Sequence, residues 1–213
     1  MERDNTTTPP FETEDLRKNL KDFLNTEHNG TKIGNYQYGV YAFFDYDGEP
    51  IYVGQTREKI STRIRRHLTN QRTDAVAMSV LDPFEVFEIE VWPVEDFPDD
   101  IGKCLDALEF TIFEKSIAGS QFKAVLNEKE PPSPQVTMEI PGSLRGRLVS
   151  EDVYNIRSHP DFRIARRALT LSRLAQVISE RQVQKGLRKT LLTQAKRLQW
   201  LAERRLNNSV SDD

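Results

Sequence analysis

Four side chains that can act on a phosphodiester lie close together in the first third of the chain. They are Tyr41, Tyr52, Arg63 and His67, and no apolar pattern accounts for them. Hydrolysis of a phosphodiester requires a positioned and deprotonated water, charge compensation on the phosphate oxygens, and help for the leaving oxygen. An arginine offers a planar fork for phosphate oxygens, and a phenol or an imidazole can take up or pass on a proton. These residue types indicate a site that cuts phosphodiester bonds.

The two tyrosines are positioned by a predicted β-hairpin over residues 37–54. An Asp-Gly pair at 47–48 separates two runs of aromatic and β-branched residues, which favours a two-residue type I′ turn. With that turn Tyr41 faces Gly54, and Tyr52 becomes a diagonal neighbour of Tyr41 on the same face, roughly 7 to 8 Å away. A slip of one residue would separate the two phenols.

Arg63 and His67 belong to a predicted helix that follows the hairpin. Apolar residues at four-residue spacing define its buried side, and these are Ile60, Ile64 and Leu68. Arg63 and His67 are also four residues apart, so they share a face and can meet one phosphate. Arg65 and Arg66 point elsewhere, where they either hold neighbouring phosphates or are solvated.

Tyr41 is the candidate general base. A free phenol has a pKa of roughly 10, so its anion must be favoured by nearby cations. Arg63, protonated His67 and a metal ion are the cations available. Tyr52 and His67 would then orient water or phosphate, or relay the proton.

A single glutamate is the candidate metal ligand. Residues 100–117 read as a helix, and Glu109 lies on the side expected to be buried, among Leu105, Leu108 and Ile112. A carboxylate in such surroundings requires a cation, and Mg²⁺ binds well to one carboxylate while keeping waters and taking substrate oxygens. A two-metal site would show several clustered acids. The sequence therefore predicts one metal.

A third strand is predicted over residues 84–91, where acids alternate with apolar residues. Glu88 and Glu90, together with Glu85, are the alternative metal ligands. The alternation places them toward solvent instead.

In this order the residues resemble the GIY-YIG nuclease family. Gly39-Val40-Tyr41 and Tyr52-Val53-Gly54, ten residues apart, correspond to its two name-giving triplets. The resemblance covers about residues 36–128. The four further matches are Arg63 and His67 on the helix, Glu109 as the metal-binding glutamate, and Asn127 as the asparagine that closes the module.

The resemblance implies an α+β fold (an α/β sandwich) with a small three-stranded antiparallel sheet flanked by helices, and a metal-dependent DNA endonuclease using one Mg²⁺ or Mn²⁺. The implied catalytic residues are Tyr41, Tyr52, Arg63, His67 and Glu109, and the expected substrate-binding residues are Gly54, Arg65, Arg66 and Asn127. Arg63 lies one residue further from Gly54 than in many family members. This departure leaves open a register in which another arginine takes its role.

Each of these residues also has an ordinary structural explanation. Aromatic residues on a hairpin usually pack across strands, His67 fits an ordinary helix-surface position, and Asn127 fits a cap or turn. The nuclease hypothesis requires the Glu109 carboxylate to lie on the same side of the sheet as the hydroxyls of Tyr41 and Tyr52. A catalytically inactive DNA-binding protein and a protein-interaction module are the alternatives.

A proline cluster at residues 131–134 marks a domain boundary, because consecutive prolines cannot continue a helix or an inner strand. The predicted regions are an N-terminal tail and helix (1–35), a nuclease-like domain (36–129), a Pro/Gly-rich linker (130–144) and a basic helical C-terminal region (145–213).

The C-terminal region carries most of the positive charge. From residue 141 onward there are 15 Lys and Arg against 7 Asp and Glu, a balance of +8, so the first 140 residues carry −11 of the net charge of −3. Helical periodicity over residues 163–179 and 187–206 predicts a helical hairpin. Its basic residues either grip a DNA backbone or form the charged outer face of helices docked on a core.

Composition restricts the remaining possibilities. Hydrophobic residues make up 37% and charged residues 30% of the 213, and no apolar run approaches the roughly 20 residues of a membrane span. The single Cys104 excludes an internal disulfide and, with only 3 His, a cysteine zinc site. A reducing cytoplasm is the expected location. DNA is the expected partner, and breaking both strands with one site would need a homodimer or two successive visits.

Overall fold

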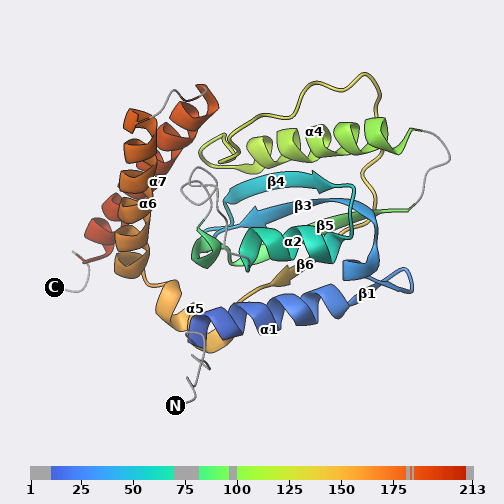
Figure 1. The fold of residues 1–213 in the computed structure, drawn as a ribbon. Coiled ribbons are helices and arrows are strands. Elements are labelled where there is room, and N and C mark those ends of the chain that lie inside the picture. Colours follow the sequence, from blue (N-terminus) through green and yellow to red (C-terminus); the bar gives the residue numbers. More distant parts are fainter. Residues whose placement is uncertain (1–10, 70–81, 96–99, 181–182, 184, 210–213) are drawn as a thin grey trace, which may run out of the picture.

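The computed structural model describes residues 11–69, 82–95, 100–180, 183 and 185–209. Its mixture of helices and an antiparallel sheet confirms the predicted α+β class (Figure 1). Residues 1–10 of the predicted N-terminal tail lie outside the described residues.

A four-stranded antiparallel sheet forms the centre of the fold, in the strand order β4-β3-β5-β6. Its strands are β3 (Tyr38–Phe44), β4 (Pro50–Thr56), β5 (Glu88–Val94) and β6 (Leu144–Arg147). The prediction of a three-stranded sheet is therefore wrong. β4 and β6 are the two edges, so one strand of the tyrosine hairpin lies at the margin of the sheet.

β6 is a short strand held to β5 by charge pairs. Arg147 lies opposite Glu88 and Arg145 opposite Glu90, and Arg145 Nη2 is 2.7 Å from Glu88 Oε2. Opposite charges facing each other across strands stabilise a sheet. The Leu-Arg-Gly-Arg sequence of β6 lacks the β-branched and aromatic residues that identify strands, which is why its pattern did not predict one.

The third predicted strand begins and ends later than expected. A short η2 helix (Pro83–Glu85) precedes β5, which continues past residue 91 through Trp92 and Pro93. The ladder between β5 and β6 stops at Val91, opposite Leu144, so Pro93 lies beyond it, where a proline interrupts no pairing with β6.

The predicted hairpin register is confirmed. Tyr41 pairs with Gly54 and Phe43 pairs with Tyr52, so both tyrosine side chains leave the sheet on one face. Antiparallel pairing alternates the two faces residue by residue, and the next residue after Gly54 therefore points to the opposite face.

The connection between β3 and β4 is longer than the predicted two-residue turn. Phe44 pairs with Pro50 after a register irregularity, and the Asp45 amide donates to the Glu49 carbonyl at 3.0 Å. Gly48 alone has a positive φ there, of 76°, whereas a type I′ turn requires positive φ at both central residues. The register survives because the irregularity lies at the turn.

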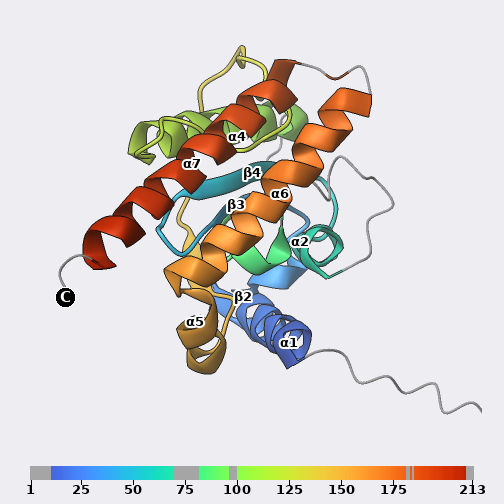
Figure 2. The same ribbon diagram turned by 90° about the vertical axis from the view of Figure 1, so that its left-hand side faces the viewer.

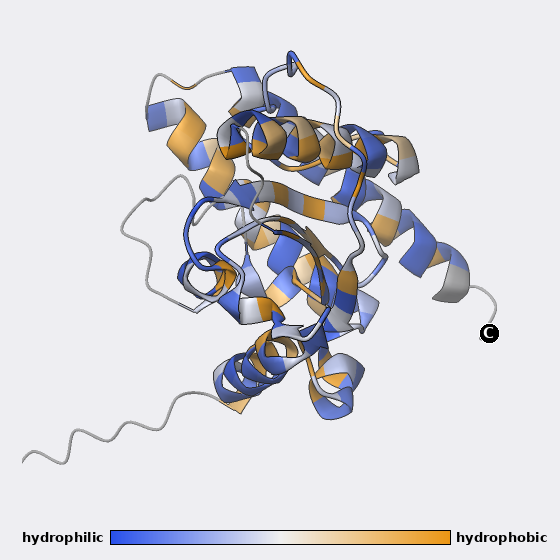
Figure 3. Cartoon of the chain, turned by 90° about the vertical axis from the view of Figure 1, so that its right-hand side faces the viewer, coloured by the Kyte–Doolittle hydropathy of each residue, from blue (hydrophilic) through white to orange (hydrophobic). Residues whose placement is uncertain are grey.

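Helices cover both faces of the sheet (Figure 1). α1 (Phe11–Asn25) and α2 (Ile60–Leu68) pack on the face that carries Tyr41 and Phe43, and α4 (Ile101–Gly119) packs on the other. The predicted buried stripe of α2 is confirmed, since Ile60, Ile64 and Leu68 are all buried. Hydrophobic and hydrophilic residues alternate around these helices (Figure 3), as expected where one side faces a core.

Short elements connect α1 to the sheet. A ribbon of β1 (Glu27–His28) and β2 (Thr31–Lys32) and the η1 turn (Ile33–Asn35) follow α1 and lead into β3.

Helices follow β6 in the C-terminal region, whose first residues, 145–147, belong to that strand and not to the predicted helical region. α5 (Glu151–Arg157) leads into α6 (Pro160–Glu180) and α7 (Lys185–Ser209), which run side by side as a helical hairpin (Figure 2). They stand at the end of the sheet where β3 turns into β4. Among the described residues, none of the helices has the length and hydropathy needed to cross a bilayer.

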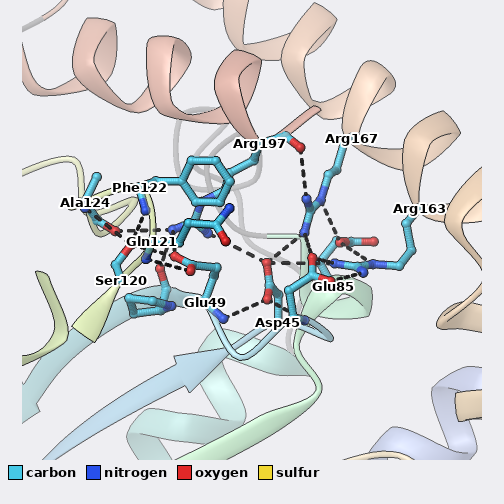
Figure 4. Close-up of polar contacts among 12 residues, drawn as sticks. Asp45, Glu49, Glu85, Ser120, Gln121, Phe122, Ala124, Arg163, Arg167 and Arg197 are labelled. Carbon is cyan, nitrogen blue, oxygen red and sulfur yellow. Dashed lines mark hydrogen bonds and ion pairs between the residues drawn. The ribbon is translucent and has the colours of Figure 1, made fainter. Parts of the chain in front are cut away.

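A cluster of buried ion pairs fastens this helical hairpin to the β3–β4 turn (Figure 4). Arg163 donates to the Asp47 carboxylate from both terminal guanidinium nitrogens, at 2.9 and 2.5 Å. Arg167 Nη2 lies 2.7 Å from Asp45 Oδ2. Arg197 donates to the carbonyl of Pro50 at 3.0 Å and is 1% exposed. We call this set the arginine clasp; its members are Arg163, Arg167 and Arg197 with Asp45, Asp47, Glu49 and Glu85.

The arginine clasp accounts for part of the positive charge of the C-terminal region. Its three arginines neutralise acids of the β3–β4 turn and of η2, so they are not part of an external basic surface. Docking on the sheet therefore accounts for these three charges. Others on the same helices remain exposed, and these include Arg173, Lys185, Arg188 and Lys196.

Glu85 is buried in the clasp and does not face solvent as the sequence predicted. It is 9% exposed, and its Oε2 lies 3.3 Å from Arg167 and 3.9 Å from Arg163. Burial raises the pKa of Glu85 to about 7, although both arginines lower it. Since Glu88 and Glu90 pair with Arg145, all three alternative metal ligands face arginines.

Arg197→Met should lower the free energy of unfolding by about 3 kcal/mol or more, because it leaves buried acids without one of their cations. Arg188→Met, on an exposed position of the same helix, is the matched control and should stay within about 0.5 kcal/mol of wild type. Denaturant-induced unfolding measures both. Equal effects would mean that the clasp does not hold α7 on the sheet.

Candidate active site

The Tyr41 hydroxyl is the centre of a buried hydrogen-bonded group between β3 and α2. Tyr41 is fully buried, its hydroxyl lies 3.1 Å from His67 Nε2, and Arg63 Nε donates to it at 3.2 Å. One turn of α2 separates Arg63 from His67, which lets both reach the same oxygen. The structure therefore brings these three predicted residues together, with Arg63 rather than another arginine beside Tyr41.

Tyr52 completes the group from β4. Its ring centroid lies 5.9 Å from that of Tyr41 and 5.1 Å from that of His67. Tyr52 also acts on the ionisation of its neighbours, because it raises the pKa of both Tyr41 and Arg63. The predicted convergence of the two phenols is confirmed, although His67 is buried and not on the helix surface.

Two glycines make room for this packing. A Cβ on Gly54 would lie 2.6 Å from the Tyr52 ring carbon Cε1, so the ring covers the bare backbone of β4. A Cβ on Gly39 would lie 2.8 Å from Ile60 Cδ1 and 2.9 Å from the carbonyl oxygen of Trp92. The glycines of the two triplets thus allow close packing. Gly54 lies under the Tyr52 ring, and Gly39 lies under Ile60 at the start of α2.

Burial dominates the ionisation of Tyr41. It raises the pKa of the phenol above its ordinary value, Tyr52 raises it further, and Arg63 lowers it only in part. The guanidinium of Arg63 therefore does not offset the effect of burial on the pKa of the Tyr41 phenol. The hydroxyl is a neutral group with a proton to donate.

Glu109 reaches the site at the open edge of β4. Along this edge the carbonyl of Ile51 accepts from the amide of Leu126 at 3.1 Å. Asn127 then binds both backbone groups of Val53, at 3.0 and 2.7 Å. These contacts use alternate residues of β4, and Gln55 is the next residue in that series.

Gln55 joins Glu109 to a second carboxylate. Its Nε2 donates to Glu109 Oε2 at 3.0 Å and to Asp106 Oδ1 at 2.6 Å. Burial raises the pKa of Glu109, the side chain and backbone of Gln55 lower it by hydrogen bonding, Asp106 raises it, and Arg63 lowers it. Glu109 is thus within electrostatic range of Arg63, which itself bonds Tyr41.

The requirement that Glu109 and the tyrosine hydroxyls share one side of the sheet is not met. Tyr41 and Tyr52 face α2, whereas Glu109 extends from α4, which covers the opposite face. The two halves are linked electrostatically, because Arg63 lowers the pKa of Glu109. Arg63 belongs to the α2 side of the sheet and Gln55 to the α4 side, so the candidate residues are divided between the two faces at edge strand β4.

The remaining predicted residues have mixed positions. Arg65 is exposed on α2, and Arg66 forms an ion pair with Glu58. Asn127 uses its side-chain amide to pair with β4, a structural contact.

Gln55 and Asp106 are the two site residues that sequence reasoning missed. Gln55 directly follows the second triplet, and Asp106 lies three residues before Glu109 on the same helix face. Those two spacings are the signals that could have identified them.

The donor set at the edge fits a divalent cation that retains waters. Among residues 11–69, 82–95, 100–180, 183 and 185–209, no group of three or more His, Cys, Asp and Glu could cage a metal ion. One or two carboxylates are nevertheless the usual protein share of a Mg²⁺ site. The Gln55 amide turns its nitrogen to Asp106 and Glu109, and its buried Oε1 has no hydrogen-bond partner in the described part of the chain. Two carboxylates and an amide with an unpaired oxygen are thus neighbours at this edge.

A comparison with known families gives one match. Residues 37–117 match the family model of the GIY-YIG catalytic domain. The matched range contains Tyr41, Tyr52, Arg63, His67 and Glu109 and ends before Asn127. No curated protein and no solved structure matches the chain.

Gly54→Ala should displace the Tyr52 ring from its place over β4 and cost about 1 to 3 kcal/mol of stability. Gly119→Ala is the control, because a Cβ there meets nothing within 4 Å. Ring carbon and proton shifts of Tyr52, together with denaturant unfolding, give the measurement. Unchanged Tyr52 shifts in the Gly54 variant would contradict the close packing.

Proposed function

Because residues 37–117 match the GIY-YIG catalytic domain, we propose that the protein is a DNA endonuclease that uses one divalent ion, Mg²⁺ or Mn²⁺. The observation that carries the proposal is the hydrogen-bonded group of Tyr41, His67 and Arg63 at the same strand edge as Glu109. A proton acceptor, a phosphate-binding cation and a carboxylate ligand thus gather at one margin of the sheet.

Tyr41 passes a proton on when it accepts one. Because Arg63 Nε–H donates to the Tyr41 oxygen, the single proton of that hydroxyl is free to point at His67 Nε2, 3.1 Å away. In the proposed step the attacking water gives its proton to the Tyr41 oxygen as Tyr41 gives its own to His67. This relay needs no free phenolate, which fits a phenol whose pKa is raised by burial.

Arg63 binds the phosphate that is attacked. Its Nε is engaged by Tyr41, and the terminal nitrogens of a guanidinium fork suit phosphate oxygens. When bound at Glu109, the divalent ion supplies Lewis-acid stabilisation of charge on the phosphate and the leaving oxygen. Tyr52, next to Tyr41 and Arg63, helps to orient the water or the phosphate.

DNA reaches the site across the exposed side of α2. Arg65 lies there and is exposed, and Arg66 forms an ion pair with the partly exposed Glu58. Phosphate contacts of this kind set affinity and register without reading sequence. The exposed basic residues of α6 and α7 are a second place for backbone contacts. A single site cuts one strand at a time, so cutting both strands requires a homodimer or two visits.

Glu109→Gln and Arg63→Ala should each reduce Mg²⁺-dependent cutting of plasmid DNA by about 100-fold or more, while DNA binding survives. Glu109→Gln should leave stability without metal unchanged or higher, because a glutamine can still accept from Gln55 and no buried charge remains. Glu114→Gln, on an exposed turn of α4, is the control and should cut normally.

The same assay separates the alternatives. DNA binding by wild type without cutting would indicate an inactive DNA-binding protein. Neither binding nor cutting would indicate an interaction module built on the C-terminal helices.

Tyr41→Phe removes the proposed proton relay and little else from the shape of the core. Cutting should fall by about 100-fold to 10,000-fold, the range for losing a general acid or base, with DNA affinity retained. Tyr38→Phe, at the start of the same strand, is the matched control and should cut like wild type. A Tyr41→Phe enzyme that keeps more than about a tenth of the activity would rule out the relay.

A further inference from the structure

Gln55 occupies an unusual position for a neutral side chain. Its single amide nitrogen lies between two carboxylates, 2.6 Å from Asp106 Oδ1 and 3.0 Å from Glu109 Oε2. Its amide oxygen is buried and has no hydrogen-bond partner in the described part of the chain. The side chain thus satisfies two acids and leaves its own acceptor unused.

The orientation of this amide is fixed by charge. If Oε1 faced Asp106 and Glu109, three oxygens would converge without a proton between them. In the protein alone the nitrogen must therefore face the acids, and its two N–H groups take the place of a positive charge. A cation at this point would provide what the amide nitrogen now provides, with more charge.

We propose that Gln55 is a ligand of the divalent cation held by Glu109, and that its amide turns over by half a rotation when the cation binds. This inference rests on the proposed function. After the turn, Oε1 faces the cation together with carboxylate oxygens of Glu109 and Asp106. Amide and carboxylate oxygens are ligands that Mg²⁺ and related ions accept, and waters or phosphate oxygens fill the remaining positions.

Rotating the Gln55 amide does not add to its polar groups that lack a hydrogen-bond partner. The far side of the Gln55 amide, where Oε1 now lies, has no partner in the present orientation. Exchanging nitrogen and oxygen leaves that side unpaired as before, while the near side exchanges two hydrogen bonds for a cation. Only the terminal torsion changes, because the two ends of an amide have nearly the same shape.

The surroundings give the cation a way in. Asp106 is 42% exposed, and its other partner, Arg57, is 57% exposed at 3.1 Å. Exposed ion pairs of this kind are weak, so Arg57 yields readily. Gln55 itself lies on edge strand β4, which fixes its backbone next to Glu109.

Manganese binding to the full chain tests the proposal. Calorimetric titration of Mn²⁺ should give one site in wild type and at least tenfold weaker binding in Gln55→Leu and in Asp106→Asn. Gln55→Glu, which keeps an oxygen at the same place, should bind at least as tightly as wild type. Gln176→Leu is the control, because the Gln176 amide also donates to a carboxylate, Glu180, but far along α6.

A second readout follows the amide directly. In nitrogen-15 spectra the two side-chain amide protons of Gln55 should move on addition of Mg²⁺, since they leave their carboxylate acceptors. Unfolding midpoints in a chelator identify variants that fail to fold. Binding to folded Gln55→Leu that equals or exceeds wild type would overturn the proposal, because the amide would then be a bystander or a competitor.

Plasmid cutting in the same preparations distinguishes a failure of the proposed function from a failure of the Gln55 proposal. Wild type that neither takes up Mn²⁺ nor cuts DNA would refute the proposed function and this inference with it. Wild type that binds Mn²⁺ and cuts, with Gln55→Leu binding equally well, would refute the inference alone.

Discussion

The antiparallel register of β3 and β4, with β4 at the margin of the sheet, is the constraint on which the site depends. Pairing Tyr41 with Gly54 sends Tyr41 and Tyr52 toward α2. The same register sends the next residue, Gln55, toward α4 and Glu109. In the described part of the chain no strand lies beyond β4, so this edge borders both faces of the sheet. A slip of one residue would exchange the faces and separate the phenols from each other and from the arginine of α2.

The C-terminal helices act on this same hairpin from its other end. Arg163 and Arg167 bind acids of the β3–β4 turn, and Arg197 binds the carbonyls of Pro50 and Ala124. Ala124 precedes the segment that pairs with the edge of β4 through Asn127. One set of buried cations therefore supports the turn and the closing segment together. Part of the positive charge of the C-terminal region is therefore neutralised inside the protein, by acids of the preceding part of the chain, and is not offered to an anionic partner.

Local patterns predicted the elements that carry the site, and long-range contacts decided the rest. Apolar spacing gave α2 and α4, and the aromatic runs gave the hairpin register, since each signal is contained within one short segment. β6 was missed because a four-residue strand with two arginines is defined by the glutamates opposite it. Glu85 was misplaced because its burial depends on arginines that follow it by about eighty residues. Gln55 and Asp106 can be recognised as site residues only when β4 and α4 are seen side by side.

The placement of Glu109 changed the picture of the site most. Sequence alone suggested one face with all groups converging, whereas the acids and the phenols lie on two faces joined at an edge.

The most direct test is diffraction at the manganese absorption edge from crystals of the full chain grown with Mn²⁺ and a DNA duplex. The account predicts one metal peak roughly 2.0–2.6 Å from a Glu109 carboxylate oxygen, with a DNA phosphate between it and Arg63. A duplex bound along α6 and α7, with no metal at the edge of β4, would contradict it.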